Sequence, residues 1–465
     1  MFASMAQRFK NADRNTPMLL PPDLRDWVAE DDLVHFVIEA VQRLPLSDFV
    51  INHRGCGDEQ YPPHLMLALL IYCYANGIFS SRRIERATYR DVAVRYLTAN
   101  THPDHDTICT FRRQNLEAVA QAFVKVLELA RELQLLQVGM VSIDGTHIQA
   151  SASKDKNLTY ERAQQLRAQL KQDVAELLQQ AEQADATEKR DPQQLPQEIA
   201  RREKLLEKME KACAQLEARA QKRADAQRAD YERKLAERQQ REGCAKGAPP
   251  KPPETSPGLK DQINLTDADA RLMRKNQRES YTQSYNAQVV VDATGSQLIV
   301  GQRVSDCASD AAQLEPNLQS IPAALGQPNR VLADCGYASQ EVLQRFSEQR
   351  PELELYVSVQ GEHTHAQRTY EYRPTEKMSQ PRKLTAPVLL AMAEKLKTPE
   401  GQRTYRQRAC TVEPVFGIIK GSLGFRQFLL RGLKKVSGEW NLICLAYNLK
   451  RLHRLGANLN ALPAS

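Results

Sequence analysis

The amino-acid sequence predicts an α/β protein in which a mixed sheet is combined with an all-helical N-terminal region and a helical insertion. Residues 1–135 repeat apolar side chains at helical spacing. Short apolar, strand-like runs occur at 138–144 and again after residue 259, separated by helical segments, which is the pattern of an α/β sheet. Between them, residues 159–242 are rich in Gln, Ala, Glu and Lys and are predicted to be helical apart from a break.

Composition narrows the class of protein. A length of 465 residues favours two or three domains, and 42% hydrophobic with 26% charged residues indicates a soluble globular chain. The net charge of +7 permits an acidic partner such as nucleic acid without establishing one. Nine cysteines have neither C-x-x-C pairs nor zinc-site spacing, so we expect reduced, mostly buried thiols. The N-terminus lacks a signal-peptide core, and the apolar run at 65–75 is too short to cross a membrane.

The N-terminal region is predicted to contain several helices. One carries Leu33, Phe36 and Val37 on its apolar face, and two more lie between residues 61 and 97 with a break near Asn76 and Gly77. A long helix then follows, with a capping signal at Asp106 or Thr107.

Arginines cluster in this region. These arginines have two possible interpretations. They could form a solvated helical face, or they could contact phosphates in a helix-turn-helix-like module, and the pattern alone leaves both open. The cluster comprises Arg82, Arg83, Arg86, Arg90, Arg95, Arg112 and Arg113.

The insertion at 159–242 is predicted to be a helical hairpin or short coiled coil, broken at 191–196. It could fold on itself or against a partner. A Pro- and Gly-rich linker follows at 243–258. The predicted organisation is therefore a helical domain (1–135), an α/β domain in two pieces (136–158 and 259–465), and the insertion and linker between those pieces.

Two of the expected strands each end in an Asp. A hairpin is expected at 286–292 and 297–304, and a further strand ends at Asp334. The first strand, 138–144, ends in the same way, at Asp144. If these strands are neighbours, the two carboxylates lie close together, which is unfavourable unless a charge neutralises them. Mg²⁺ does so with oxygen ligands, although each Asp alone is more simply explained as a turn or cap residue.

Glu413 is a candidate third carboxylate. It directly precedes Pro414, which predicts the start of an amphipathic helix. The simpler explanation is a favourable negative charge at a helix N-terminus.

Together these segments resemble a known family. SIDGTHI, LADCGYAS and YRQRACTVEPVFGIIKGSLGFRQFLLRGLKK are similar to the three blocks of bacterial insertion-sequence DDE transposases, and PDHDTICTFRR with the preceding helices is similar to the helical domain that many of them carry. The resemblance implies an RNase H-like catalytic domain in which Asp144, Asp334 and Glu413 are the catalytic, metal-binding triad. It also implies Mg²⁺ or Mn²⁺, with two ions.

The third block carries further residues of that family. Tyr405, Arg408 and Lys420 match its Tyr, Arg and Lys positions, and we expect them, with Arg82, Arg83, Arg112 and Arg113, to contact DNA. Six residues separate Glu413 from Lys420, as in the family, whereas four rather than three separate Arg408 from Glu413. An ordinary basic helix face is the alternative for Arg408 and Lys420.

The resemblance implies a function. It is hydrolysis of DNA at element ends followed by transfer of the 3′-OH strand into target DNA, with terminal inverted repeats and target DNA as partners. A homodimer on DNA, a bacterial cytoplasmic and nucleoid-associated location, and no membrane partner are implied as well. Two alternatives remain: a transposase-derived DNA-binding protein without turnover, and a metal-dependent nuclease without strand transfer. The insertion could be a dimerisation arm, a DNA clamp or a spacer.

Overall fold

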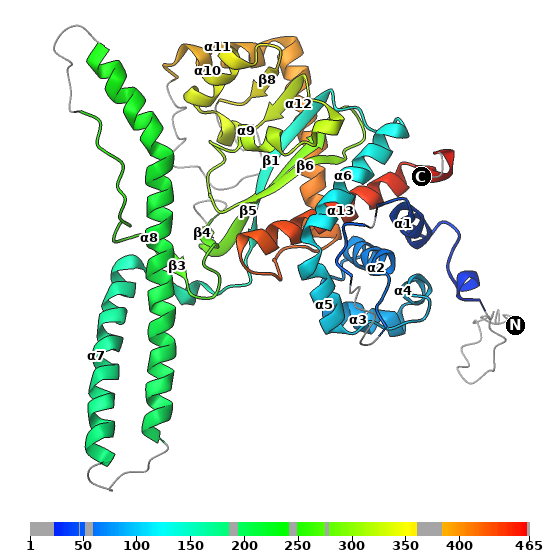
Figure 1. The fold of residues 1–465 in the computed structure, drawn as a ribbon. Helices are drawn as coiled ribbons and strands as arrows, with labels where there is room; N and C mark the ends of the chain where they lie inside the picture. The colour runs from blue at the N-terminus through cyan, green and yellow to red at the C-terminus, as the bar shows by residue number, and fades with distance from the viewer. Residues whose placement is uncertain are drawn as a thin grey trace, which may run out of the picture.

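The structure is a computed structural model that describes residues 23–45, 47–51, 59–185, 194–240, 249–274, 279–359 and 384–462. Figure 1 shows a helical group formed by the N-terminal part of the chain, a twisted sheet with helices around it, and a long pair of helices that extends away from both.

The helical group begins the chain. Its helices are α1 (Leu33–Gln42), α2 (Pro63–Ala75), α3 (Ser81–Arg90), α4 (Val92–Leu97), α5 (His105–Gln114) and α6 (Leu116–Glu132). The prediction of one long helix after residue 105 is wrong, because this segment forms two separate helices, α5 and α6. Asp104, not Asp106 or Thr107, caps α5 by accepting a hydrogen bond from the Thr107 amide at 2.6 Å. Asn115 then ends α5, and its side-chain amide donates to the Phe111 carbonyl at 2.9 Å.

The main sheet has six strands among the described residues. They are β1 (Met140–Gln149), β4 (Arg271–Met273), β5 (Thr282–Asp292), β6 (Ile299–Ser305), β7 (Arg330–Ala333) and β8 (Glu354–Val357). β5 pairs with β4 and β6 along one edge and is antiparallel to β1 on the other. β7 is parallel to both β1 and β8. The expected mixed α/β sheet is therefore confirmed.

β1 is longer than the sequence pattern predicted. It pairs with β5 as far as Gln149, but its pairing with β7 stops at Ile143 and Ala333. Asp144 therefore lies inside β1, at the point where the neighbouring strand ends, and Asp334 directly follows that shorter strand. The two carboxylates meet beside a gap in the sheet rather than at two strand ends.

Glu413 and Pro414 lie inside α12 (Pro399–Gly417), so the expectation that a helix starts there is wrong. Thr398 caps the actual start by accepting from the Gly401 amide at 3.0 Å. Pro414 has no N–H to donate to the Cys410 carbonyl, one turn earlier. The side chain of Gln297 replaces that donor, at 2.7 Å from the Cys410 oxygen. A π turn, Ile418–Ser422, ends the helix.

The last helix, α13 (Leu433–Arg454), joins the helical group to the sheet. It packs against α2, α6 and β6. The buried Trp440 indole donates to the Gln288 carbonyl at 3.1 Å, and Asn448 bonds both the amide and the carbonyl of Ile299. Of the smaller helices, α9 (Leu314–Gln319) contacts β5 and β6, whereas α10 (Gln340–Gln349) packs against α11 (Pro387–Lys397), which contacts β8.

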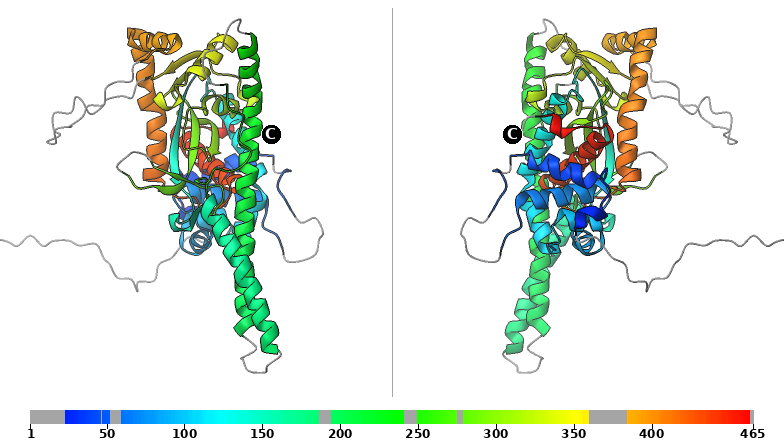
Figure 2. Two further views of the ribbon diagram at one scale, coloured as in Figure 1. Left: turned by 90° about the vertical axis from the view of Figure 1, so that its left-hand side faces the viewer. Right: turned by 90° about the vertical axis from the view of Figure 1, so that its right-hand side faces the viewer.

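The insertion is a pair of long helices, α7 (Tyr160–Asp185) and α8 (Gln194–Gln240), which run side by side (Figures 1 and 2). Two short strands, β2 (Asn157–Thr159) and β3 (Gln262–Asn264), pair at its base. Small apolar side chains fill the contact, among them Ala163, Cys213 and Leu216.

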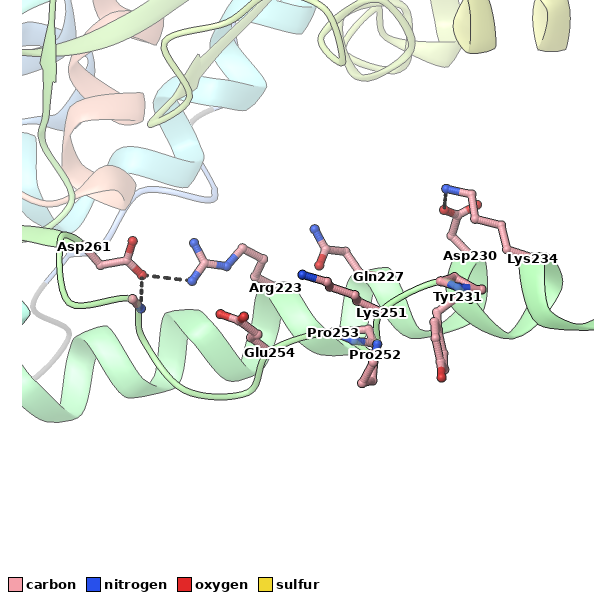
Figure 3. Close-up of a pocket in the computed structure, with 12 residues that line it drawn as sticks. Arg223, Gln227, Asp230, Tyr231, Lys234, Lys251, Pro252, Pro253, Glu254 and Asp261 are labelled. Atoms are coloured by element: carbon pink, nitrogen blue, oxygen red, sulfur yellow. Dashed lines mark hydrogen bonds and ion pairs between the residues drawn. The ribbon is translucent and has the colours of Figure 1, made fainter. Parts of the chain in front are cut away.

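A hollow of about 650 Å³ lies where the Pro-rich segment passes the C-terminal half of α8 (Figure 3). Two ion pairs line it, Arg223 with Asp261 at 2.9 Å and Lys234 with Asp230 at 2.6 Å, together with the charged side chains of Lys251 and Glu254.

Two remaining expectations have mixed outcomes. Of the cysteines in the described ranges, Cys73, Cys213 and Cys444 are buried, whereas Cys307, Cys335 and Cys410 are exposed, so the thiols are not mostly buried. All of these described cysteines are free thiols. The apolar run at 65–75 forms the core of α2, and no helix in the described part of the chain is long and apolar enough to cross a membrane.

Gly77 provides a test of how the helical group is joined to the rest. Its φ is +76°, and a Cβ there would lie 2.7 Å from the Leu423 carbonyl oxygen. We expect Gly77→Ala to lower the free energy of unfolding by about 2–4 kcal/mol, from left-handed strain plus overpacking. Gly326→Ala is the control, because φ there is +82° with nothing within 4 Å, so only the strain applies. Equal losses in urea denaturation would show that the Leu423 contact does not matter.

Candidate active site

Two of the predicted carboxylates line one cavity. Asp144 and Asp334 border a space of about 490 Å³ beside the gap where β7 ends, and Lys420 lines the same space. Glu413 is not among its lining residues. The sheet thus brings Asp144 and Asp334 together. Glu413, the third acid, lies on α12 and contacts Arg408 of the same helix, which in turn bonds Asp144.

Asp144 is a mostly buried acid, with 17% of its side chain exposed. Its Oδ2 accepts a hydrogen bond from Arg408 Nη2 at 2.8 Å, and its Oδ1 accepts from the Gly145 amide at 2.9 Å. Burial raises the pKa of Asp144 to about 7; Arg408 opposes this shift, whereas the charges of Asp334 and Asp310 add to it. Asp144 therefore binds a proton far more readily than an exposed carboxyl.

Arg408 connects the acids. It comes from α12 and is buried, and its Nη1 also lies 3.4 Å from Glu413 Oε1. Burial pushes the pKa of Arg408 down, but Asp144 and other nearby groups outweigh burial and raise it. The Nε atom has no hydrogen-bond partner in the described part of the chain. Glu413 is more open, with 57% of its side chain exposed.

The Asp334 side chain both caps a turn and borders the cavity. Its carboxylate accepts from the Gly336 amide at 2.9 Å, which is the turn-capping arrangement that a strand-end Asp often has. The same side chain borders the cavity, so capping fixes its orientation towards that space.

Lys420 and Tyr405 differ in their surroundings. Lys420 Nζ donates to Thr146 Oγ1 and, at 2.9 Å, to the His147 carbonyl, which anchors it to β1 at the cavity wall. Tyr405 is partly buried and packs against Leu332 and Tyr356 on the sheet.

The residues fit a divalent cation of the Mg²⁺ type. Among the described residues, no three His, Cys, Asp or Glu side chains are grouped closely enough to hold one ion. Mg²⁺ needs fewer, because it binds through one or two carboxylates and completes its shell with water and phosphate oxygens. Asp144 and Asp334 supply such a pair. Glu413 does not join them, because Arg408 lies between it and Asp144.

Part of this cavity was not predicted from the sequence. Asp310, in the loop between β6 and α9, and Asn286 on β5 also line it. Gln288, two residues along β5, is fully buried and hydrogen-bonded to Asp310. The buried amides of Asn286 and Gln288 were a signal, because a buried amide requires a partner.

The predicted DNA contact of Arg112 is wrong. Its side chain is buried, and its Nη1 donates to the Tyr74 hydroxyl at 2.7 Å and to the Phe79 carbonyl at 3.3 Å. Arg112 thus belongs to the interior of the helical group. Arg82, Arg83 and Arg113 are exposed, as DNA contact would require.

Comparison with known families assigns the chain. Residues 22–114 match the family described as Transposase domain (DUF772), and residues 364–453 match the family described as Transposase DDE domain. Both matches support an insertion-sequence DDE transposase. The resemblance seen in the sequence is therefore confirmed. The DDE match contains Tyr405, Arg408, Glu413 and Lys420, whereas Asp144 and Asp334 lie outside both matched segments. Searches of curated proteins and of solved structures found no match.

Asp144 predicts a pH dependence of stability in this transposase. Its pKa is about 7 in the folded chain and about 3.9 when unfolded. Between these values the folded chain binds more protons, so the contribution of Asp144 to stability is lost as the pH rises. Relative to the wild type, Asp144→Asn should therefore gain roughly 2 kcal/mol between about pH 5 and about pH 8, measured by urea unfolding in EDTA. A difference that does not change with pH would show that Asp144 titrates in its ordinary range.

Proposed function

We propose that this transposase hydrolyses the DNA phosphodiester at element ends and then joins the freed 3′-OH strand to target DNA. The observation that carries the proposal is the convergence of Asp144 and Asp334 on one cavity, at the point where β7 leaves β1 without a neighbour. Arg408 links the third acid, Glu413, to the same place. In this proposal Asp144, Asp334 and Glu413 are the catalytic residues.

The proposal includes an RNase H-like catalytic domain formed by residues 136–158 and 259–465. The strand arrangement supports it: β6, β5 and β1 form an antiparallel series, and β7 and β8 continue it in parallel with β1. The helical region 1–135, the insertion 159–242 and the linker 243–258 are the other proposed units.

Each residue near the cavity has a proposed role. Asp144 and Asp334 hold the cation, Glu413 acts beside them, and Lys420 contacts a DNA phosphate from the cavity wall. Tyr405 contacts DNA from α12, whereas the buried Arg408 positions Asp144 and Glu413, so its predicted contact with DNA is not part of the proposal. Bound Mg²⁺ or Mn²⁺, two ions in this proposal, activates the attacking oxygen and stabilises the leaving oxygen.

The bond changes of the proposed reaction balance in two steps. A water oxygen first bonds to phosphorus, and the 3′ oxygen leaves and takes up a proton. That 3′-OH then bonds to a target phosphorus, loses its proton, and displaces the target's own 3′ oxygen. The carboxylates and Lys420 face the reacting phosphate throughout.

The proposed partners are double-stranded DNA, both the terminal inverted repeats and the target, and a second copy of the chain as a homodimer on DNA. The proposed location is the bacterial cytoplasm, at the nucleoid. A DNA-binding protein without turnover and a nuclease without strand transfer are the competing functions.

Helix α3 is the proposed DNA-contacting surface of the helical group. Arg82, Arg83, Arg86 and Arg90 are exposed on it, whereas Ile84, Ala87 and Thr88 face the core. None of these four arginines forms an ion pair within the described ranges. Tyr89, exposed on the same face, stacks on His102 with ring centroids 3.9 Å apart. Unpaired arginines next to a flat aromatic stack suit phosphates and nucleotide surfaces.

The central prediction concerns cleavage. Labelled DNA spanning the gene's own flanks is incubated with purified protein and Mg²⁺ or Mn²⁺. Asp144→Asn should lower the cleavage rate by more than about 100-fold, because even the loss of an indirect metal contact costs about 10–100-fold. The surface variant Glu315→Gln, which removes one charge from an ion pair with Arg345, should cleave normally.

The competing functions give different results in that assay. Specific binding by both proteins without cleavage by either would favour the DNA-binding protein. Cleavage at a fixed end position without joined product, when target DNA is supplied, would favour the nuclease.

A second prediction concerns α3. Replacing Arg82 and Arg83 with Ala should weaken binding to DNA and reduce the slope of log affinity against log salt by about 0.9 for each phosphate that is no longer neutralised. Arg345→Ala, which removes the partner of Glu315, is the control of equal charge change per site. Unchanged affinity and slope in the double variant would place the DNA-contacting surface elsewhere.

A further inference from the structure

A third carboxylate, Asp310, lines the same cavity as Asp144 and Asp334. Two glycines show where it lies, because a Cβ added at either glycine would be close to Asp310. A Cβ on Gly145, which follows Asp144, would lie 2.9 Å from Asp310 Oδ1. A Cβ on Gly336 would lie 3.4 Å from Asp310 Oδ2 and 3.0 Å from Asp334 Oδ1. Asp310 therefore borders the residues next to both acids, although it comes from a separate loop.

Two buried amides hold the Asp310 carboxylate. Asn286 Nδ2 donates to its Oδ1 at 2.8 Å, and Gln288 Nε2 donates to the same atom at 2.6 Å. Both amide residues are almost fully buried, with 1% and 0% of their surface exposed. Both bonds use Oδ1, so within the described residues Oδ2 is left without a donor.

The oxygen of the Gln288 side-chain amide is hydrogen-bonded as well. Its Oε1 accepts from Asn317 Nδ2 at 2.7 Å and from the Tyr337 hydroxyl. Asn317 is on α9 and Tyr337 follows β7, so three separate segments hold this one amide. An apolar side chain at Gln288 would satisfy a buried strand more simply, because each buried polar group must find partners. The network that replaces it reaches the cavity at Asn286 and at the Asp310 carboxylate.

The charges around the cavity are unbalanced. Asp144, Asp310, Asp334 and Glu413 contribute four negative charges when ionised, and Arg408 and Lys420 contribute two positive charges. Arg274 and Glu279, which also line the cavity, cancel each other. The excess of two negative charges equals the charge of one divalent cation.

We propose that Asp310 is a fourth acidic residue of the active centre, which supports the divalent cation held by Asp144 and Asp334 through a bridging water molecule. Asn286 and Gln288 are its positioning residues. This inference rests on the proposed function, since it concerns the same cavity, and adds a residue that lies outside both matched family segments.

The test measures binding of Mn²⁺ to the full chain without DNA, by isothermal titration calorimetry. Asp310→Asn is the informative variant, because its Oδ1 still accepts the two amide hydrogen bonds while the charge is removed. We expect its Kd for Mn²⁺ to rise about tenfold or more, in line with the loss of a supporting metal ligand. Glu315→Gln, in the neighbouring helix α9 and outside the cavity, should bind as the wild type does. If Asp310→Asn fails to fold, Asp310→Ser keeps an oxygen acceptor at the site.

The outcomes separate this inference from the proposed function. Wild-type affinity in the Asp310 variant, with binding abolished in Asp144→Asn, would overturn the role of Asp310 and leave the proposed function intact. No binding of Mn²⁺ by the wild type, together with no metal-dependent cleavage of DNA, would overturn both. A tenfold loss in Asp310→Asn and a similar loss in Gln288→Leu would support both the carboxylate and its positioning network.

Discussion

The pair formed by Asp144 and Arg408 is the interaction on which the candidate active site depends. Asp144 is buried in the sheet close to two other acids, an arrangement that would be strongly unfavourable without a compensating charge. Arg408 supplies that charge at 2.8 Å from the carboxylate. The same guanidinium reaches Glu413, so one buried cation connects the sheet to the helix that carries the third acid. The position of α12 over the sheet is therefore part of the site.

The surrounding structure supports this pair in specific ways. β7 is four residues long, and its end beside Ile143 opens the space into which Asp144 and Asp334 project. α12 continues through Pro414 because Gln297, from the loop between β5 and β6, bonds the carbonyl that proline leaves without a donor. Without that bond the helix would kink just where Glu413 must be held. The gap and the uninterrupted helix together set the geometry of the acids.

Much of the fold follows from local sequence pattern, and the departures have physical causes. The hairpin near residue 290, the strand before Asp334 and the long helices of the insertion were predictable from periodicity. The length of β1 was not, because pairing with β5 beyond Asp144 is a long-range contact that overrides the local turn signal of Asp144 and Gly145. Pro414 suggested a helix start, and only a side chain more than a hundred residues away explains why the helix continues.

Some residues of the candidate site could likewise be predicted from the sequence, and others could not. Asp144 and Asp334 could be proposed from their position after apolar runs, and Glu413, Arg408 and Lys420 from family resemblance. Arg112 was misassigned, because the residues that bury it, Tyr74 and Phe79, lie on another helix and the loop after it. Asp310 could not be found from its own neighbours in the sequence. Its significance comes from Asn286 and Gln288 on β5, which no local pattern connects to it.

The most direct measurement of the central claim is the anomalous diffraction of a crystal grown with Mn²⁺ and a DNA oligonucleotide that ends in the element's 3′-OH. The account predicts an anomalous peak in the cavity, within coordination distance of carboxylate oxygens of Asp144 and Asp334, with the DNA phosphate beside Lys420. An empty cavity in crystals that contain bound DNA and Mn²⁺, with Arg408 still bridging Asp144 and Glu413, would contradict it.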